Sequence, residues 1–177
     1  MRLTFEDAFK RLINIEQGYT NDPNDNGNWT GGVKGRGVLR GTKYGIAANT
    51  YPDVDIKGLT LAQAKEIYRR DWWLKLGADE LPSSIVFQVW DFAVNAGMGT
   101  AKRLLQRAAG VAEDGVMGPV SIAAVNKCNE NDILLKYNAY KIRHYTSLSN
   151  LWASYGKGWM NRTADNLLYA ANDNSDT

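Results

Sequence analysis

Cysteine and histidine are scarce in this sequence. Cys128 is the single cysteine among 177 residues, so no disulfide can form within the chain and the packed core must hold the fold. We expect this lone thiol to be inert rather than reactive. His144 is the single histidine, and one cysteine with one distant histidine cannot supply the usual ligand spacing of a zinc site. The sequence therefore predicts no metal site.

Long apolar runs are also missing. No stretch reaches the roughly 20 apolar residues that a membrane-spanning helix requires. Acidic residues occur within the first seven positions and no apolar run follows, which is not the pattern of a secretory signal peptide. We therefore expect a protein made in the cytoplasm, without a signal peptide or transmembrane segment. A substrate beyond the membrane would then be reached only after release by another agent.

A strong charge of one sign is absent as well. The formal net charge is +2 with both signs spread along the chain, which argues against the clustered basic face of a nucleic-acid-binding protein. A slight positive excess suits an anionic polymer such as a bacterial cell wall. Six tryptophans and nine tyrosines are many for this length, and they can fill a core or line a groove for sugar rings.

Apolar periodicity predicts a mostly helical chain with one polar, β-prone segment near its start. A first helix begins at a Thr4–Asp7 capping pair, carries apolar residues at helical spacing and ends near Gly18. Residues 17–58 are rich in Gly, Asn, Asp and Thr, which predicts hairpins and loops with a short β-structure at 42–46. Further helices are expected from Thr60 to about Asp71, from Ser83 or Ser84 to Asn95, from Thr100 to Gly110, from Pro119, from Asn131 or Asp132 through Leu148, and after Trp159. The helix ending at Asn95 is apolar nearly all round, so we expect it to be central.

Glu16 is an unusual residue for its place in the first helix. It lies four residues after Leu12 and seven after Phe9, so it continues the apolar stripe. Burial and the negative end of the helix dipole both favour the protonated acid. A protonated carboxylic acid is what a glycosidase uses to protonate a leaving oxygen. The alternative is a structural ion pair with an arginine or lysine.

A second carboxylate follows in Asp25, with Asp22 as a competitor for the same role. A helix end leading into a hairpin can set two carboxylates on either side of a cleft, as glycoside hydrolysis requires. Both aspartates also suit ordinary turns. The segment copies the first half of a calcium-binding EF-hand loop, but its twelfth position holds Val33 instead of glutamate, which excludes that site. The glycine-rich stretch from 31 to 41 lacks the ending of a phosphate-binding loop.

Several motifs resemble glycoside hydrolase family 108, lysozyme-like N-acetylmuramidases that include many phage endolysins. In the first half they are residues 16–25, Thr42-Lys43-Tyr44-Gly45-Ile46 and residues 59–73. The second half resembles the peptidoglycan-binding region usually fused to that family, at residues 90–97, 114–119 and 157–162. The resemblance covers about residues 5–170. Phage-type lysozymes use a catalytic triad of Glu, Asp and Thr, and residues 26–41 are an insertion relative to many members. The third residue is therefore either Thr42, which has the matching Tyr-Gly-Ile context, or Thr30, which is nearer the usual spacing.

The resemblance implies roles for individual residues. Glu16 would protonate the glycosidic oxygen, Asp25 would activate water or stabilise charge on the sugar, and Thr42 would help to hold the water. The separation of the carboxylates would decide between inversion and retention. The residues implied in substrate binding are Tyr19, Tyr44, Asn95 and Arg162, with Arg162 also a candidate partner for Glu16. Trp90 is expected to pack in the core.

These observations predict a mainly α, lysozyme-like α+β fold, with a small β-hairpin-containing N-terminal lobe and a larger helical lobe. Residues 1–90 would form the catalytic region, 91–172 the peptidoglycan-binding region and 173–177 a tail. The expected protein is a monomeric, cofactor-free endolysin that cleaves the β-1,4 bond between N-acetylmuramic acid and N-acetylglucosamine and lyses bacteria, with a holin for export. A lytic transglycosylase of the same fold and a non-catalytic cell-wall-binding module are the alternatives.

Overall fold

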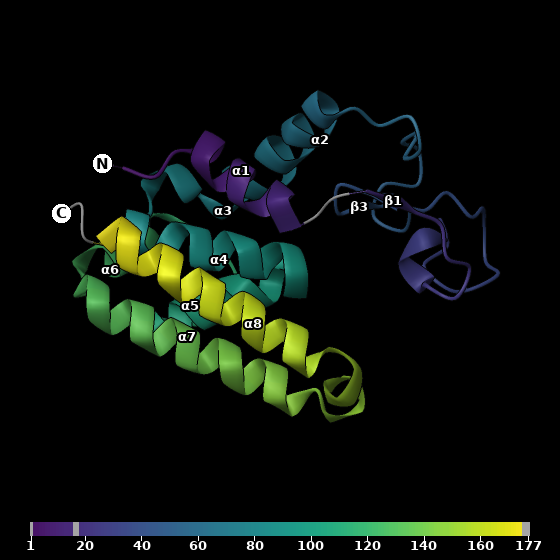
Figure 1. Cartoon of the computed structure of the whole chain (residues 1–177). Helices are drawn as coiled ribbons and strands as arrows, with labels where there is room; N and C mark the ends of the chain where they lie inside the picture. Colours follow the sequence, from purple (N-terminus) through teal and green to yellow (C-terminus); the bar gives the residue numbers. More distant parts are fainter. Residues whose placement is uncertain (1, 16–17, 175–177) are drawn as a thin grey trace. The chain divides into compact units, whose positions relative to one another are not determined.

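The computed structural model describes residues 2–15 and 18–174, which form two units (Figure 1). The hairpin unit comprises Glu6–Arg70, and the helical unit comprises Met1–Phe5 with Asp71–Thr177. Helices dominate the described residues, and the one sheet found among them is small and lies in the hairpin unit. The predicted mainly α fold with a small β-containing N-terminal part is thus confirmed. None of the described helices is long and apolar enough to cross a membrane.

The hairpin unit combines two helices with a three-stranded antiparallel sheet in the order β1-β2-β3. Its elements are α1 (Phe5–Ile15, of which Phe5 belongs to the helical unit), β1 (Tyr19–Thr20), the 3-10 helix η1 (Asn26–Asn28), β2 (Thr42–Lys43), β3 (Ile46–Ala47) and α2 (Leu61–Tyr68). Thr42 in the central strand pairs with Thr20 on one side and with Ala47 on the other. The β-structure predicted at 42–46 is therefore present as the β2–β3 hairpin.

Residues 26–41 fold back on themselves between η1 and β2. Trp29 forms an isolated antiparallel bridge with Leu39. The backbone N–H of Thr30 donates to the carbonyl of Val38, and its hydroxyl accepts from the N–H of Val38. The insertion is thereby a closed loop that returns the chain to β2 without adding a named strand.

The helical unit is built around α4 (Ser83–Ala96), in which every residue from 84 to 93 is buried. Before it lie the π-helix η2 (Arg69–Trp73), which spans the boundary of the units, α3 (Leu74–Leu76) and η3 (Ala78–Glu80). After it come α5 (Met98–Ala109), α6 (Pro119–Lys127), α7 (Glu130–Ser147) and α8 (Ser149–Asn174). Helix α4 packs against α5, α7 and α8 (Figure 1), which confirms its predicted central position. Trp90 is fully buried, with its ring edge-on to Trp73.

Three predicted helix starts are wrong. Helix α5 begins at Met98, directly after Gly97 at φ 95°, so Thr100 lies inside the helix and does not cap it. The cap of α7 is Asn129, whose side chain accepts from two backbone N–H groups and replaces the predicted Asn131 or Asp132.

The predicted start of the last helix, after Trp159, is also wrong, because α8 begins at Ser149 and runs through Gly156 and Gly158. Gly156 is buried in the helix, and a Cβ there would lie 2.7 Å from the indole of Trp152. The Trp152 ring thus occupies the space that a side chain at position 156 would need. A glycine that weakens an isolated helix is tolerated here because tertiary packing stabilises it.

Candidate functional site

Asn28 organises the part of the hairpin unit in which three candidate residues lie. Its side chain is fully buried. Its Nδ2 donates to the carbonyl oxygen of Asp22 at 3.0 Å, and its Oδ1 accepts from the Thr42 hydroxyl at 2.7 Å. Its backbone carbonyl also accepts from the N–H groups of Arg40 and Gly41. One side chain thus joins the turn that carries Asp22 and Asp25 to strand β2.

This arrangement fixes the direction in which the Thr42 hydroxyl points its proton. The carbonyl of Asp22 can only accept, so the NH2 of the Asn28 amide must face it and the amide oxygen must face Thr42. The Thr42 hydroxyl therefore donates to Asn28, and its oxygen keeps its lone pairs for another donor. A water molecule is such a donor.

Thr30 is placed differently. Its hydroxyl accepts from the backbone N–H of Val38 at 2.9 Å and closes the loop of residues 26–41. That contact gives Thr30 a structural task in the insertion. Thr42, in contrast, is bound through Asn28 to the turn that carries the candidate carboxylates.

Asp25 and Asp22 are both exposed and both stabilise turns. The Oδ1 of Asp25 caps η1 by accepting from the N–H of Gly27 at 2.8 Å. The Oδ1 of Asp22 accepts from the backbone and side-chain amides of Asn24. In each carboxylate the contacts fall on a single oxygen, so turn formation leaves the second oxygen available for chemistry. The turn role and the catalytic role are therefore compatible.

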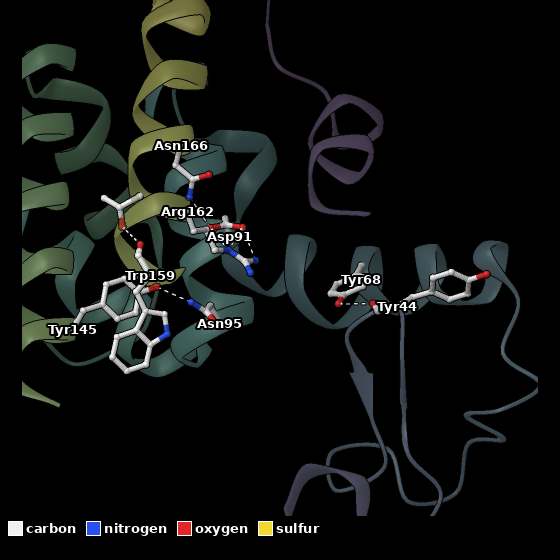
Figure 2. Close-up of polar contacts among 9 residues, drawn as sticks. Tyr44, Tyr68, Asp91, Asn95, Tyr145, Trp159, Arg162 and Asn166 are labelled. Atoms are coloured by element: carbon white, nitrogen blue, oxygen red, sulfur yellow. Dashed lines mark hydrogen bonds and ion pairs between the residues drawn. The ribbon is translucent and has the colours of Figure 1, made fainter. Parts of the chain in front are cut away.

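Tyr44 has a backbone conformation that is rare for a large side chain. It lies at φ 52° in the two-residue turn between β2 and β3, followed by Gly45 at φ 75°. Asparagine or glycine is preferred at such a position. The hydroxyl of the fully buried Tyr68 holds the turn by donating to the Tyr44 carbonyl at 2.9 Å (Figure 2). A strained residue held by a buried partner is a frequent mark of a functional position.

Tyr19 lines a surface cavity of about 390 Å³ together with Arg40, Asp55 and Lys57. Its hydroxyl donates to the carbonyl of Arg40 at 3.3 Å, and its side chain is about a third exposed. Glu16 lies outside the described residues. Its role, its distance from Asp25 and its pairing with Arg162 therefore stay predictions.

Arg162 lies in the helical unit, where Asp91 holds it. Its Nη2 donates to Asp91 Oδ1 at 2.8 Å, and its Nε lies 3.1 Å from both carboxylate oxygens (Figure 2). Asn166 adds a third donor, with Nδ2 at 2.6 Å from Asp91 Oδ2. Asp91 is almost completely buried in α4. Sequence reasoning missed its role, although a single carboxylate in an otherwise apolar helix was the signal.

Lys141 adds a second buried cation near this pair. Its side chain is 1% exposed, and its Nζ has no hydrogen-bond partner among the described residues. Burial lowers its pKa to about 8, opposed by the attraction of Asp91 and reinforced by the repulsion of Arg162. Burial likewise raises the pKa of Tyr137 on the same helix.

Asn95 ends α4 beside a group of aromatic rings. Its Nδ2 donates to the hydroxyl of Tyr145 at 2.7 Å (Figure 2). Tyr145 stacks on Trp159 with ring centroids 4.8 Å apart, and Tyr155 stacks on the same indole at 5.9 Å. Burial raises the pKa of Tyr145 to about 12. Tyr155 and Trp152 are more than a third exposed, so this face of α8 presents aromatic rings to solvent.

The predicted site residues thus fall into two groups. Tyr19, Asp25, Thr42 and Tyr44 belong to the hairpin unit, whereas Asn95 and Arg162 belong to the helical unit. Within the hairpin unit the structure joins Thr42 to the Asp22–Asp25 turn, and within the helical unit it joins Arg162 to Asp91. Asn28, Asp91 and Asn166 are the positioning residues that sequence patterns did not reveal.

Comparison with known proteins identifies the family. A solved structure of SagA from Brucella abortus is 28% identical, with a TM-score of 0.81 over 94% of this chain and 93% of that chain. No curated protein matches significantly. A model described as predicted peptidoglycan domain matches residues 100–164. The model described as glycosyl hydrolase 108 matches residues 9–97, half of the chain. The chain therefore belongs to the glycosyl hydrolase 108 family and is a glycoside hydrolase with peptidoglycan as its substrate.

Proposed function

We propose that this glycoside hydrolase is a muramidase, which hydrolyses the β-1,4 bond between N-acetylmuramic acid and N-acetylglucosamine. The observation that carries the proposal is the link through Asn28 between Thr42 and the turn of Asp22 and Asp25. That link supports a joint action on one water molecule, in which a carboxylate of the turn takes a proton from the water and the Thr42 oxygen accepts a hydrogen bond from it. Hydrolysis needs such a group to direct water, whereas a transglycosylase needs only an acid.

In the proposed reaction Glu16 donates its proton to the glycosidic oxygen as the bond from that oxygen to the anomeric carbon breaks. Water adds to the anomeric carbon and gives a proton to Asp25. The Thr42 oxygen accepts a hydrogen bond from this water, because its own proton is already donated to Asn28. One proton leaves Glu16 and one arrives at Asp25, and exchange with solvent restores both groups. In this form the reaction inverts the anomeric configuration.

The same proposal assigns different functions to the two halves of the chain. Residues 1–90 carry out catalysis, and residues 91–172 bind the polymer. The exposed rings of Trp152 and Tyr155 support the second role, because aromatic faces suit the apolar faces of sugar rings. Tyr19 and Tyr44 act as stacking residues near the reacting sugars, and Asn95 and Arg162 complete the substrate contacts.

Digestion of purified peptidoglycan followed by mass spectrometry tests the reaction. We expect hydrolytic fragments that end in a reducing N-acetylmuramic acid. Fragments ending in a 1,6-anhydro sugar would overturn the proposal and establish a lytic transglycosylase. Reducing ends on N-acetylglucosamine would overturn the choice of bond.

Variants test the residues. We expect Glu16→Gln and Asp25→Asn each to lower the rate by about 100-fold to 10,000-fold, the usual contribution of a general acid or base. Glu6→Gln is the matched control. It removes an exposed carboxylate of α1 that pairs with Lys65, and it should keep full activity. Wild-type activity in folded Glu16→Gln would refute its role as the acid.

The proposed biological role is bacterial lysis as a phage-type endolysin that acts as a monomer. This role rests on the family resemblance. Expression in a bacterial cytoplasm should lyse the cells only when a holin-type pore is expressed with it. Lysis without the pore would overturn this route of release, while sedimentation of a dimer would overturn the monomeric state.

A further inference from the structure

A basic groove lies between α5 and α7 of the helical unit. It encloses about 400 Å³. Helix α5 contributes Thr100, Arg103, Leu104 and Arg107, at the spacing of one helix face. Helix α7 contributes a face with the same spacing, namely Tyr140, Arg143, His144 and Ser147. All of these residues lie within the match to the predicted peptidoglycan domain.

The charge of the groove is strongly positive for its size. Three arginines line it, against Glu113 as the one lining acid. Glu113 is engaged by Arg107, whose Nε and Nη2 lie 2.8 and 2.7 Å from its two carboxylate oxygens. Arg107 also lies over the ring of Tyr140, with 5.5 Å between its Cζ and the ring centroid.

Arg103 and Arg143 are the two exposed guanidinium groups that remain. Neither makes a hydrogen bond or ion pair with another residue in the described part of the chain. The carboxylates of Glu113 and Asp114 both attract Arg103, but neither is bonded to it. Glu113 is bonded to Arg107, and the Oδ1 of Asp114 accepts from Gln106 and from the N–H of Val116. The groove therefore offers two planar, charged donors to an external anion.

Arg103 lies against a loop that hydrogen bonds hold in place. This loop is Asp114-Gly115-Val116, one of the motifs that the proposed reaction does not use. Gln106 is fully buried, and its amide accepts from the N–H of Gly115 and donates to Asp114 and Val116. Gly115 lies at φ 77°, and a Cβ there would lie 3.4 Å from the guanidinium carbon of Arg103. That distance is an ordinary van der Waals contact, so Arg103 lies against the loop, and the positive φ is what favours glycine at this position.

The substrate class decides which anion fits. The N-acetylated glycan backbone of peptidoglycan is uncharged where the lactyl groups are linked to peptides, so its negative charges are the carboxylates of the stem peptides. Guanidinium groups bind carboxylates through paired N–H donors. Sugar rings, in contrast, need aromatic faces and neutral hydrogen-bonding groups.

We propose that the groove of Arg103 and Arg143 binds the carboxylates of peptidoglycan stem peptides. This inference rests on the proposed function, because it takes peptidoglycan as the polymer. It assigns the groove a task separate from bond cleavage. The groove selects glycan that still carries its peptides and holds the enzyme on it.

The test compares the double variant Arg103→Gln/Arg143→Gln with Lys127→Gln/Lys136→Gln, which removes the same charge from exposed positions outside the groove. Both are made with Glu16→Gln, so that binding is measured without digestion. The first probe is purified peptidoglycan, prepared with and without its phosphate polymers. The second is the phosphate-free material after an amidase has removed the stem peptides and the lactyl carboxylates thus freed have been converted to amides, so that the glycan carries no charge. Pull-down gives the dissociation constants.

We expect the arginine variant to bind intact peptidoglycan about tenfold more weakly, the sum of two exposed ionic contacts. Its binding to peptide-free glycan should equal that of the lysine control. Equal binding of both variants to intact peptidoglycan would overturn the inference. So would a loss that appears only when phosphate polymers remain attached, since phosphate would then be the ligand.

Failure of the two proposals can be told apart. If product analysis refutes the muramidase reaction, the pull-down still reports whether the groove recognises stem peptides. If the groove fails, the reducing-end products of the wild-type enzyme are unchanged.

Discussion

The hydroxyl of Thr42 lies 2.7 Å from the amide oxygen of Asn28, and this contact connects the central strand to the turn of Asp22 and Asp25. Asn28 is buried within the hairpin unit, so no solvent can replace a lost partner. The catalytic role proposed for Thr42 and its structural role therefore use different parts of one hydroxyl. The proton serves the fold and the lone pairs serve the water.

Substitutions at Thr42 and Thr30 should show which of the two threonines takes part in hydrolysis. Thr42→Val leaves the Asn28 oxygen without its donor, so we expect a loss of about 1–3 kcal/mol in the free energy of unfolding, together with a strong loss of hydrolysis. Thr42→Ser keeps the hydroxyl and should retain both. Thr30→Val should keep activity, because its hydroxyl only closes the insertion loop. Urea unfolding and peptidoglycan turnover provide the two measurements; greater loss of activity in Thr30→Val would reverse the assignment.

Tyr44→Gly should weaken substrate binding while sparing the fold. Glycine removes the left-handed strain of roughly 1–2 kcal/mol, which offsets the lost contacts of a half-exposed ring. We therefore expect stability within about 1 kcal/mol of wild type and a raised KM. Tyr44→Phe keeps the ring and should bind nearly as wild type. Thermal unfolding and initial rates on soluble glycan fragments check the pair, and an unchanged KM in Tyr44→Gly would exclude stacking.

Asp91→Asn should destabilise the helical unit by about 3–5 kcal/mol. It removes the charge that compensates Arg162, whose side chain is only 14% exposed, and leaves an uncompensated buried cation. Glu113→Gln breaks the exposed pair with Arg107 and should leave the stability close to wild type. Chemical denaturation measures both. Equal effects of the two substitutions would show that burial does not strengthen the Asp91–Arg162 pair.

Lys141→Met should stabilise the protein at neutral pH. The pKa of Lys141 falls from 10.5 to about 8 on folding, so below pH 8 the buried charge carries its full cost. Converted at 1.36 kcal/mol per pKa unit, the gain in the variant is about 3 kcal/mol at most.

The stabilising effect of Lys141→Met should depend on pH. Between about pH 8 and 10.5 the unfolded chain binds the proton more tightly than the folded one, so the contribution of Lys141 to stability rises with pH. The difference between wild type and Lys141→Met should therefore shrink from pH 8 to pH 10. The raised pKa values of Tyr137 and Tyr145 lower stability above pH 10 in both proteins, so they cancel in this difference. A difference that stays constant with pH would show that folding does not lower the pKa of Lys141.

Sequence patterns were sufficient where a feature depends on near neighbours. The Thr60–Gln63 capping box, Pro119 at the start of α6 and the apolar helix α4 all lie where they were predicted. The same reasoning predicted the last helix only after Trp159, whereas α8 begins at Ser149 and includes Gly156, which is buried. Local propensity disfavours glycine in a helix, and it carries no information about the packing of the whole helix in the fold.

The candidate site shows the same division. The sequence by itself determined the family, through the order of its motifs, and selected Glu16, Asp25 and Thr42 as candidates. Only the tertiary structure decided that Asn28 serves Thr42 and that Asp91 serves Arg162, since these partners lie 14 and 71 residues apart. A buried polar group must find a partner wherever the fold brings one close. That choice depends on packing in three dimensions, which residue spacing along the chain does not encode.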